Sequence, residues 1–336
     1  MAKLTRILSI DGGGIRGIIP GQLLVAFEEM LQQESGNPMA RISHYFDLIA
    51  GTSTGGILAC AYLCPEKPGK KAPCFTAEEV VGLYFKRGHD IFDIPVFHSI
   101  RSVRGLIDEK YPAKGIEKAL KDYFGNTKLS ELLKPCLITA YDITNTRGHF
   151  FTQHDAKKSK SYDFLVRDVA RATSAAPTYF ECALVKSLTN ARYPLVDGGV
   201  FVNNPALCAY AEVRNFKSKP KAKDMLILSL GTGYTEKSYQ YKKAKDWGAL
   251  EWLKPVINIM MDGVAETVDY QLGQIYDAAN APNQYLRINP KLPKSVDPDM
   301  DNASPENLKA LKRLGVRTAK KHEAELRRIA RLLVKE

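Results

Sequence analysis

Short apolar runs, each followed by a turn or helical pattern, recur along this chain of 336 residues. Arg6–Ile10 precedes "DGGGIRG" and a helical pattern, and Tyr45–Ala50 precedes "GTSTGG" and the helical "ILACAYL". Pro135–Tyr141 and Met225–Leu230 are two further runs that read as strands. Strands that alternate with helices indicate a mainly parallel sheet whose two faces are covered by helices. We therefore expect an α/β fold arranged as a three-layer α/β/α sandwich.

The alternation weakens between residues 65 and 126. Here a charged, proline-rich stretch, "PEKPGKKAP", and the irregular "HDIFDIPVFHSIRSVRG" flank a helical pattern. This insertion either caps a site or is a plain long loop, and both interpretations stay open. From about 247 to 336 the chain reads as a C-terminal helical region. Because no repeat, low-complexity tract or linker divides the sequence, we expect one domain over 1–336, with a motif-bearing core at about 5–235.

The composition combines 45% hydrophobic residues with a formal net charge of +11. The longest apolar runs fall far short of the roughly 20 residues that cross a bilayer. The start of the chain lacks the long apolar centre of a secretory signal. We therefore expect a cytoplasmic protein without a signal peptide or transmembrane segment. A basic surface attracts anionic lipid head groups as readily as nucleic acid, so peripheral contact with an anionic membrane is one role for the charge.

Two segments are candidates for that contact, "SIRSVRG" and the basic C-terminal stretch "LKALKRLGVRTAKKHEAELRRIARLLVKE". The apolar residues of the C-terminal stretch recur near helical spacing, with basic residues between them: Leu311, Leu314, Ala319, Leu326, Ile329 and Leu333. Such a helix either lies on a membrane surface or packs its apolar stripe against its own domain.

The first candidate for a catalytic motif is "GTSTG", residues 51–55. Gly-x-Ser-x-Gly between a strand and a helix is typical of a nucleophile elbow, in which the glycines leave room for a sharp turn that exposes the serine hydroxyl. The N–H groups after the serine open the next helix and face the place where negative charge develops on an attacked ester. Ser53 is therefore the candidate nucleophile.

The sequence offers no convincing histidine to activate this serine. The six histidines are His44, His89, His98, His149, His154 and His322. Only His322 follows the late strands, where an α/β-hydrolase carries its catalytic histidine, and "TAKKHEAELRR" places it on a charged helix. Asp197 in "YPLVDGGVFVNNP" is the candidate base, with a structural Asp-Gly-Gly turn as the alternative. Burial without a cationic partner would raise its pKa and suit it to base chemistry at neutral pH.

A second glycine motif stands near the start of the chain. Gly12, Gly14 and Gly17 match G-x-G-x-x-G, so a dinucleotide-binding module is the first rival interpretation. That fold carries an acidic residue at the end of its second strand, whereas Asp47 lies near the start of that strand. Three successive glycines also present several unhindered N–H groups to one anion, here the tetrahedral oxygen of an attacked ester. Arg16 either adds positive charge there or pairs with an acid.

These motifs in this order resemble the patatin-like phospholipase family. The resemblance is carried by "LSIDGGGIRGIIPG", "YFDLIAGTSTGGILA", "ARATSAAPTYF", "LVDGGVFVNNPA" and "LSLGTG", which lie within roughly residues 5–235. It implies a patatin-like α/β/α sandwich and a Ser–Asp dyad, carried here by Ser53 and Asp197. The oxyanion hole that it implies consists of Gly12, Gly13 and Gly14, with Arg16 beside them.

The activity implied by the resemblance is hydrolysis of acyl esters in phospholipids and other polar lipids, of the phospholipase A or lysophospholipase type. It implies no calcium, and we expect no metal and no cofactor. An acyltransferase that uses the same serine and a phospholipase effector switched by cyclic nucleotides stay open, and a non-catalytic dinucleotide-binding module is the weakest alternative. The expected partner is a lipid, not a nucleic-acid polymer, and the sequence indicates no oligomeric state.

Overall fold

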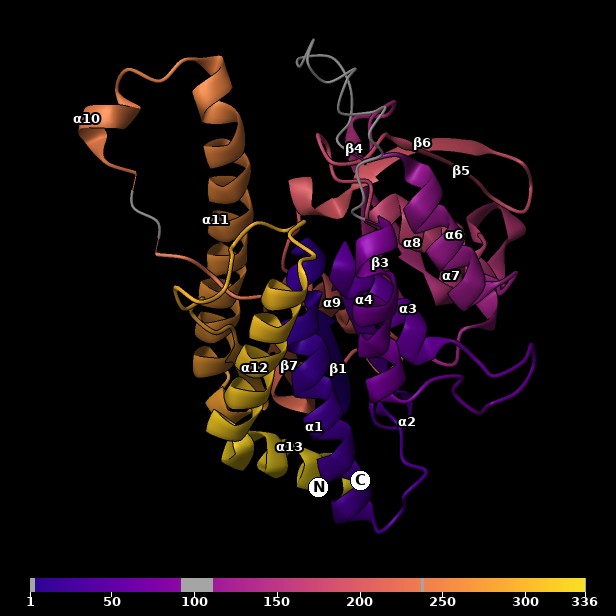
Figure 1. Ribbon diagram of the computed structural model, residues 1–336. Helices are drawn as coiled ribbons and strands as arrows, with labels where there is room; N and C mark the ends of the chain where they lie inside the picture. Colours follow the sequence, from indigo (N-terminus) through magenta and orange to yellow (C-terminus); the bar gives the residue numbers. More distant parts are fainter. Residues whose placement is uncertain (1–3, 92–110, 237–238, 336) are drawn as a thin grey trace.

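The computed structural model describes residues 4–91, 111–236 and 239–335, which Figure 1 draws in colour. The segment "SIRSVRG", one of the two expected membrane contacts, occupies residues 99–105 and lies outside the described residues. Among the described helices, none combines the length and apolar character that would let it cross a bilayer.

One eight-stranded sheet runs through the described part of the chain. Its strands are β1 (Thr5–Ile10), β2 (Leu48–Thr52), β3 (Cys136–Asp142), β4 (Arg147–Thr152), β5 (Ala183–Lys186), β6 (Arg192–Asp197), β7 (Met225–Leu230) and β8 (Tyr285–Ile288). Their order is β5-β6-β3-β2-β1-β7-β8, and β4 also pairs with β3. The series β3-β2-β1-β7-β8 is parallel throughout, whereas β4, β5 and β6 pair antiparallel. The mainly parallel sheet predicted from the sequence is confirmed.

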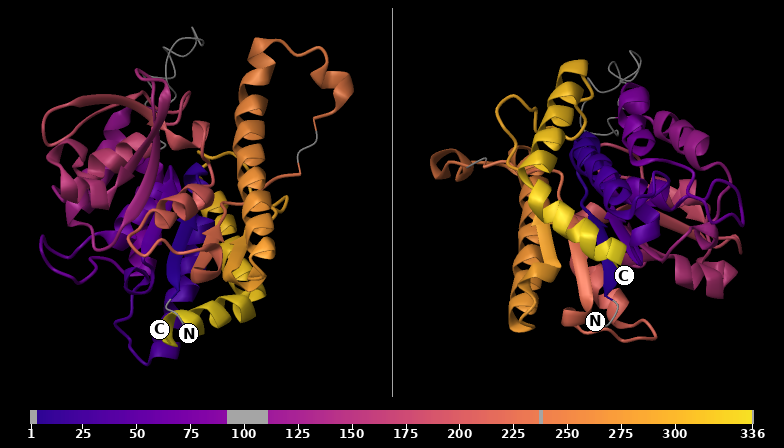
Figure 2. Two further views of the ribbon diagram at one scale, coloured as in Figure 1. Left: turned by 180° about the vertical axis from the view of Figure 1, so that it is seen from behind. Right: turned by 90° about the horizontal axis from the view of Figure 1, so that it is seen from below.

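Helices cover both faces of this sheet (Figures 1 and 2). On one face lie α1 (Ile18–Ser35), α3 (Thr54–Leu63), α4 (Ala77–Ile91), α6 (Ala113–Phe124), α8 (Val166–Thr173), α12 (Pro305–Lys321) and α13 (Glu323–Lys335). On the other lie α9 (Ala206–Arg214) and α11 (Ala249–Ala278). Consecutive strand residues point to opposite faces, so Leu8 and Ile49 join the first core while Ile7 and Leu48 join the second. Burial on both faces explains why the strands read as unbroken apolar runs.

Two helices, α4 and α6, occupy much of the described part of the insertion between 65 and 126. Val80 and Tyr84 of α4 and Ile116 and Leu120 of α6 are buried in the core that also holds α1 and α3. These two helices are therefore packed onto the body of the protein beside the carboxyl end of β2.

The two C-terminal helices bury the apolar stripe that the sequence shows. Leu311 of α12 and Leu326, Ile329 and Leu333 of α13 are almost completely buried, and both helices pack against α1. The packing alternative therefore applies, and these apolar residues are not free to enter a membrane. The region also contains the strand β8, so its description as helical from 247 to 336 is incomplete.

Candidate active site

The carboxyl ends of β2 and β6 meet on one edge of β3. β4 pairs along nearly the whole of the other edge, so β2 and β6 must share the one that remains. The parallel strand β2 ends where Thr52 pairs with Thr139, and the antiparallel strand β6 ends where Asp197 pairs with the next residue, Ala140. This register brings Asp197 next to Ser53, the residue that follows Thr52.

Ser53 lies in a strained turn that only small neighbours permit. Its φ of 54° and ψ of −123° fall in a region that costs a non-glycine residue about 1–3 kcal/mol. A Cβ on Gly51 would stand 2.2 Å from the carbonyl oxygen of Gly55, and a Cβ on Gly55 would stand 2.1 Å from that of Ile10. The Ser53 N–H donates to Oγ1 of Thr173 at 2.9 Å, which fixes the turn. The serine side chain is thus held at the amino end of α3.

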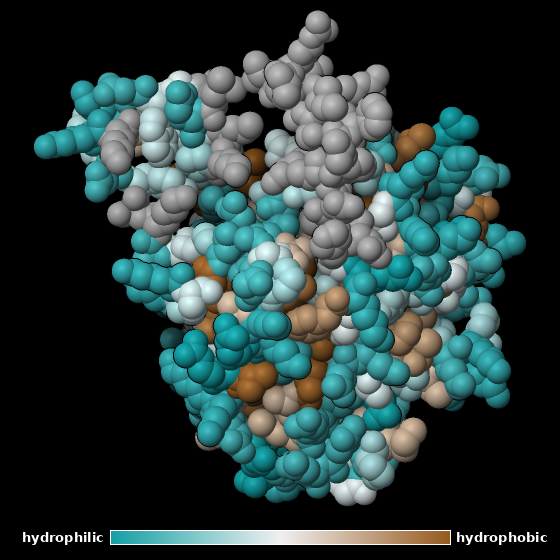
Figure 3. Space-filling model, viewed as in Figure 1, coloured by the Kyte–Doolittle hydropathy of each residue, from teal (hydrophilic) through white to brown (hydrophobic). Residues whose placement is uncertain are grey.

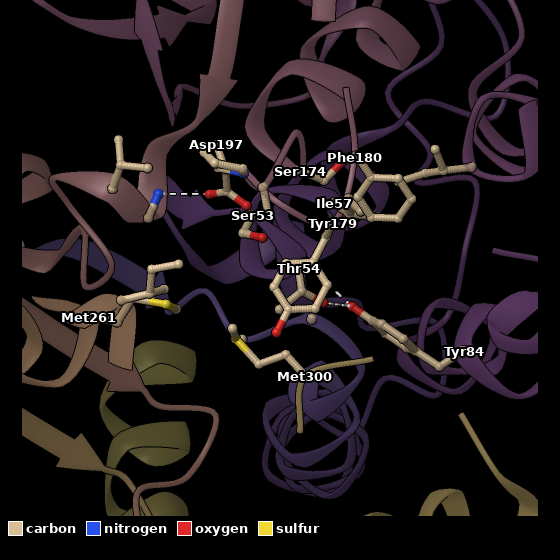
Figure 4. A pocket seen from close by; sticks show the side chains of 18 of the residues that line it. Ser53, Thr54, Ile57, Tyr84, Ser174, Tyr179, Phe180, Asp197, Met261 and Met300 are labelled. Atoms are coloured by element: carbon tan, nitrogen blue, oxygen red, sulfur yellow. Dashed lines mark hydrogen bonds between the residues drawn. The ribbon is translucent and has the colours of Figure 1, made fainter. Parts of the chain in front are cut away.

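Asp197 faces the Ser53 hydroxyl from a dry position (Figure 4). The side chain is 4% exposed, and its Oδ1 accepts the N–H of Gly199 at 2.7 Å. Burial raises the pKa of this carboxyl to about 7, while the nearby Ser53 hydroxyl and the Gly199 N–H lower it in part. A carboxylate with this pKa is half protonated near neutral pH, so it can both accept and return a proton there.

Two of the three glycines that the sequence predicts as donors line the pocket, in the loop after β1. Gly13 and Gly14 line the pocket beside Ser53. The N–H of Gly12 instead donates to the carbonyl oxygen of Asn203 at 3.1 Å, and the Gly12 carbonyl accepts the hydroxyl of Thr232 at 2.7 Å. In this geometry Gly12 anchors the loop and its N–H is already engaged, which departs from the sequence-based expectation.

Arg16 supports the same loop from behind. Its Nε donates to the carbonyl oxygen of Gly13 at 3.4 Å, and its Nη1 donates to that of Gly233 at 3.5 Å. The side chain is buried, and burial lowers the pKa of the guanidinium. Within the described ranges Arg16 forms no ion pair and is absent from the pocket lining. Its two hydrogen bonds tie the glycine loop after β1 to the loop after β7.

A cavity of about 260 Å³ opens above Ser53 and Asp197. Its walls are mostly apolar and come from elements far apart in the sequence, as Figure 4 shows. They include Leu83 and Tyr84 of α4, Ile116 of α6, Phe180, and Met260 and Met261 of α11. Tyr84 also hydrogen-bonds the hydroxyl of Thr54, which ties the insertion to the residue after the serine.

The histidines whose side chains are described lie away from this pocket. His149 is packed among Phe151, Phe164 and Tyr193, and burial lowers its pKa to about 4. His154 pairs with Glu212 at 2.8 Å. His44 and His322 do not line the cavity either. The His89 side chain and His98 lie outside the described residues.

Sequence reasoning missed two contributions to the site. Thr173, which anchors the Ser53 N–H, is the last residue of α8 and gave no separate signal beyond its place in "ARATSAAP". The methionines of α11 form part of the pocket wall, yet they lie outside the core that the motifs define. Their apolar density in "INIMMDG" was the available signal.

Comparison with known proteins relates the chain to one family. The family model "Patatin-like phospholipase" matches residues 8–210. The chain is 33% identical to "Patatin group D-2" of Solanum tuberosum, over 99% of this chain and 90% of that protein. It is 35% identical to "Patatin-like protein 2" of Arabidopsis thaliana, over 96% and 85%, and 31% identical to "Probable inactive patatin-3-Kuras 1" of Solanum tuberosum, over 99% and 93%.

Among solved structures, VipD from Legionella pneumophila matches with a TM-score of 0.41 and 13% identity, over 95% of this chain and 66% of that one. The family model covers more than half of the chain, and the plant relatives are similar along nearly all of it. The chain belongs to the patatin-like phospholipase family.

Proposed function

We propose that this protein is a lipid acyl hydrolase that cleaves carboxylic esters of polar lipids, with Ser53 as nucleophile and Asp197 as general base. The observation that carries the proposal is the Ser53 hydroxyl facing the buried carboxylate of Asp197, whose pKa is raised to about 7. One relative of similar identity is named "Probable inactive patatin-3-Kuras 1", so family membership alone does not establish catalysis. The site geometry therefore bears most of the argument.

In the first half-reaction, Oγ of Ser53 attacks the ester carbonyl carbon while its proton passes to Asp197. The N–H groups of Gly13, Gly14 and Thr54 stabilise the resulting oxyanion, because they lie where the loop and the amino end of α3 face the pocket. Cleavage of the carbon–oxygen bond releases the alcohol, which takes the proton from Asp197. The acyl group stays on Ser53 as an ester.

In the second half-reaction, water attacks the acyl-serine and gives a proton to Asp197. Collapse of this second tetrahedral intermediate breaks the bond to Oγ, which regains the proton, and releases the fatty acid. The same carboxyl thus acts as base and then as acid in each half-reaction, which requires a pKa close to the working pH.

The apolar lining of the pocket supports a lipid substrate. A dinucleotide would need polar partners for its ribose and pyrophosphate, whereas these walls offer aliphatic, aromatic and thioether groups beside the serine. The cavity of about 260 Å³ suits an acyl chain placed with its carbonyl at Ser53. The N–H of Gly12, which a pyrophosphate-binding loop would offer to its ligand, is bonded to Asn203.

The proposal is tested by Ser53→Ala, measured by hydrolysis of p-nitrophenyl butyrate and of phosphatidylcholine vesicles. We expect a loss of about 10³-fold or more in kcat, since the nucleophile is removed. Ser174→Ala is the matched control, because Ser174 lines the same pocket but donates its hydroxyl to the carbonyl of Ala170 at 2.7 Å. Ser53→Ala with near-native turnover would refute the assignment.

A further inference from the structure

The two halves of α11 have opposite surroundings. In the carboxyl half, Ala265, Val268, Leu272 and Tyr276 recur at helical spacing and are buried, the last three in the core that also holds Ile7 and Leu48 of the sheet. In the amino half, from 251 to 264, none of the side chains that the structure describes is buried. The sequence of this amino half, "EWLKPVINIMMDGV", is nevertheless no more polar than that of the carboxyl half. An apolar segment whose described side chains are not buried indicates a surface that binds another molecule.

The exposed apolar side chains of this half form one stripe. Trp252, Val256, Ile259 and Met260 are 37%, 40%, 46% and 47% exposed, respectively. Their spacing of four, seven and eight residues from Trp252 places them on one side of the helix. We call these four residues the α11 stripe. Large apolar groups gathered in this way on a surface helix mark a binding surface.

The α11 stripe is continuous with the pocket. Met260 belongs to the stripe and also lines the cavity above Ser53, and its neighbours Ile257 and Met261 line that cavity too. A molecule that covers the stripe therefore lies at the place where an acyl chain would enter. This continuity favours a lipid surface over an unrelated protein as the occupant.

Aromatic and basic residues adjoin the stripe at the amino end of α11. Trp247 packs against Trp252 and Tyr239, with ring centroids 5.0 and 5.5 Å apart. Lys242 and Lys245 are exposed on and beside the short helix α10 (Tyr241–Ala244). Figures 1 and 2 show this end of α11 and α10 extending away from the sheet, and Figure 3 shows hydrophilic residues over α10. Tryptophan and tyrosine prefer the head-group level of a bilayer, and lysine is attracted to its anionic lipids.

We propose that the α11 stripe, with Trp247 and the lysines beside it, is the surface that docks this protein on an anionic phospholipid bilayer. The stripe enters the boundary between head groups and acyl chains, while Lys242 and Lys245 contact anionic head groups. In this orientation the pocket mouth faces the lipid, so a substrate chain passes from bilayer to Ser53 without crossing water. This inference rests on the proposed function for its substrate, but the docking itself does not require catalysis.

The chain supplies its own probe, because its two tryptophans are Trp247 and Trp252. Vesicles of phosphatidylcholine and phosphatidylglycerol at 7:3 should shift the tryptophan emission of the full chain to shorter wavelength, and lipids with brominated chains should quench it. Vesicles of phosphatidylcholine alone should give a weaker response at equal lipid concentration, because the lysines lose their partners. Unchanged emission with both vesicles would overturn the proposal.

A variant pair localises the contact. Val256→Ser combined with Ile259→Ser should weaken co-sedimentation with the 7:3 vesicles about tenfold or more, because two inserted side chains lose their apolar contacts. Tyr270→Ser, which alters a 69% exposed residue of the other half of α11, should bind as the wild type does. Equal vesicle binding by the double variant would contradict the assignment. A second result would also contradict it: the wild type elutes from size exclusion as a dimer, and the double variant elutes as a monomer but still binds vesicles. The stripe would then be a dimer interface.

Hydrolysis of soluble p-nitrophenyl butyrate separates this inference from the proposed function. The double variant should keep turnover within twofold of wild type, since Val256 and Ile259 do not line the pocket. If the wild type hydrolyses no ester yet docks through the stripe, the proposed function fails and the docking surface stands. If the wild type hydrolyses esters but the double variant binds vesicles as well as the wild type does, the docking surface fails and the proposed function stands.

Discussion

The floor and the walls of the pocket are held in place by different kinds of interaction. The floor, made of Ser53, Asp197 and the loop at Gly13 and Gly14, is held by strand ends, close glycine contacts and backbone hydrogen bonds. The walls come from α4, α6 and α11, whose contribution is apolar contact. Since reaction chemistry needs fixed geometry and lipid binding needs apolar area, changes in the floor should affect every ester, whereas changes in the walls should affect only long-chain ones.

The floor should show its largest response at Asp197. Asp197→Asn removes the proton acceptor while it keeps the side chain's shape, so we expect kcat on p-nitrophenyl butyrate to fall about 10³-fold. The same change should raise the Tm at pH 8. A buried carboxyl with a raised pKa lowers stability as pH rises from about 4 to 7, and asparagine carries no charge to bury.

This gain in Tm should therefore shrink as pH falls toward 4, where the wild-type carboxyl is protonated in the folded state. Parallel thermal scans of both proteins at pH 5 and 8 measure it. Turnover within twofold of wild type would place the base on another residue, and a Tm gain independent of pH would show that charge burial is not its cause.

The glycine loop should give the next largest effect. Gly14 has a φ of 58°, and a Cβ there would stand 2.2 Å from the Met300 carbonyl oxygen, so Gly14→Ala must move the loop. Loss of one aligned N–H from an oxyanion site costs about 10²-fold in kcat. Gly36→Ala is the matched control, because Gly36 has a φ of 64° with nothing within 4 Å and lies outside the pocket. Equal activities of the two variants would remove Gly14 from the oxyanion site.

The pH dependence of kcat/KM should test the role of Asp197 in the floor without any substitution. Because the reactive form is the carboxylate and its pKa is raised to about 7, kcat/KM should fall about tenfold for each pH unit below 7. The profile of butyrate hydrolysis between pH 4.5 and 9 measures it. An acid limb centred near pH 4 would mean that the pKa of Asp197 is not raised by burial.

The walls should show a smaller, chain-dependent effect. Ile116 is buried on α6 and lines the cavity, so Ile116→Trp shortens the space left for an acyl chain. Each methylene that is excluded loses about 0.8 kcal/mol, or about fourfold in kcat/KM. A p-nitrophenyl ester series from butyrate to dodecanoate should show the loss growing with length while butyrate stays near wild type. A uniform loss along the series would erase the distinction between floor and walls.

Local signals in the sequence revealed the floor better than the walls. Gly51, Gly55 and the glycine loop stand out because their tight turns are encoded within a few residues, and the register on β3 then brings Asp197 beside Ser53. What a local pattern cannot encode is which N–H groups stay free. The N–H of Gly12 bonds to Asn203, nearly two hundred positions away along the sequence, so its engagement is visible only in the fold.

The same limit applies to the helices. The C-terminal segment and the amino half of α11 both carry apolar residues, yet α12 and α13 bury theirs against α1 while α11 leaves its stripe exposed. Periodicity reports that a helix has an apolar face, and the partner of that face depends on elements that are distant along the chain.

The central claim is that the hydroxyl at the turn after β2 is the reactive nucleophile. Labelling of the full chain with a fluorophosphonate ester, followed by digestion and mass mapping, tests it most directly. We predict one stoichiometric adduct on Ser53, formed more slowly below pH 7 and absent from Ser53→Ala. An adduct on a different side chain, or ester hydrolysis that persists while Ser53 stays unlabelled, would contradict it.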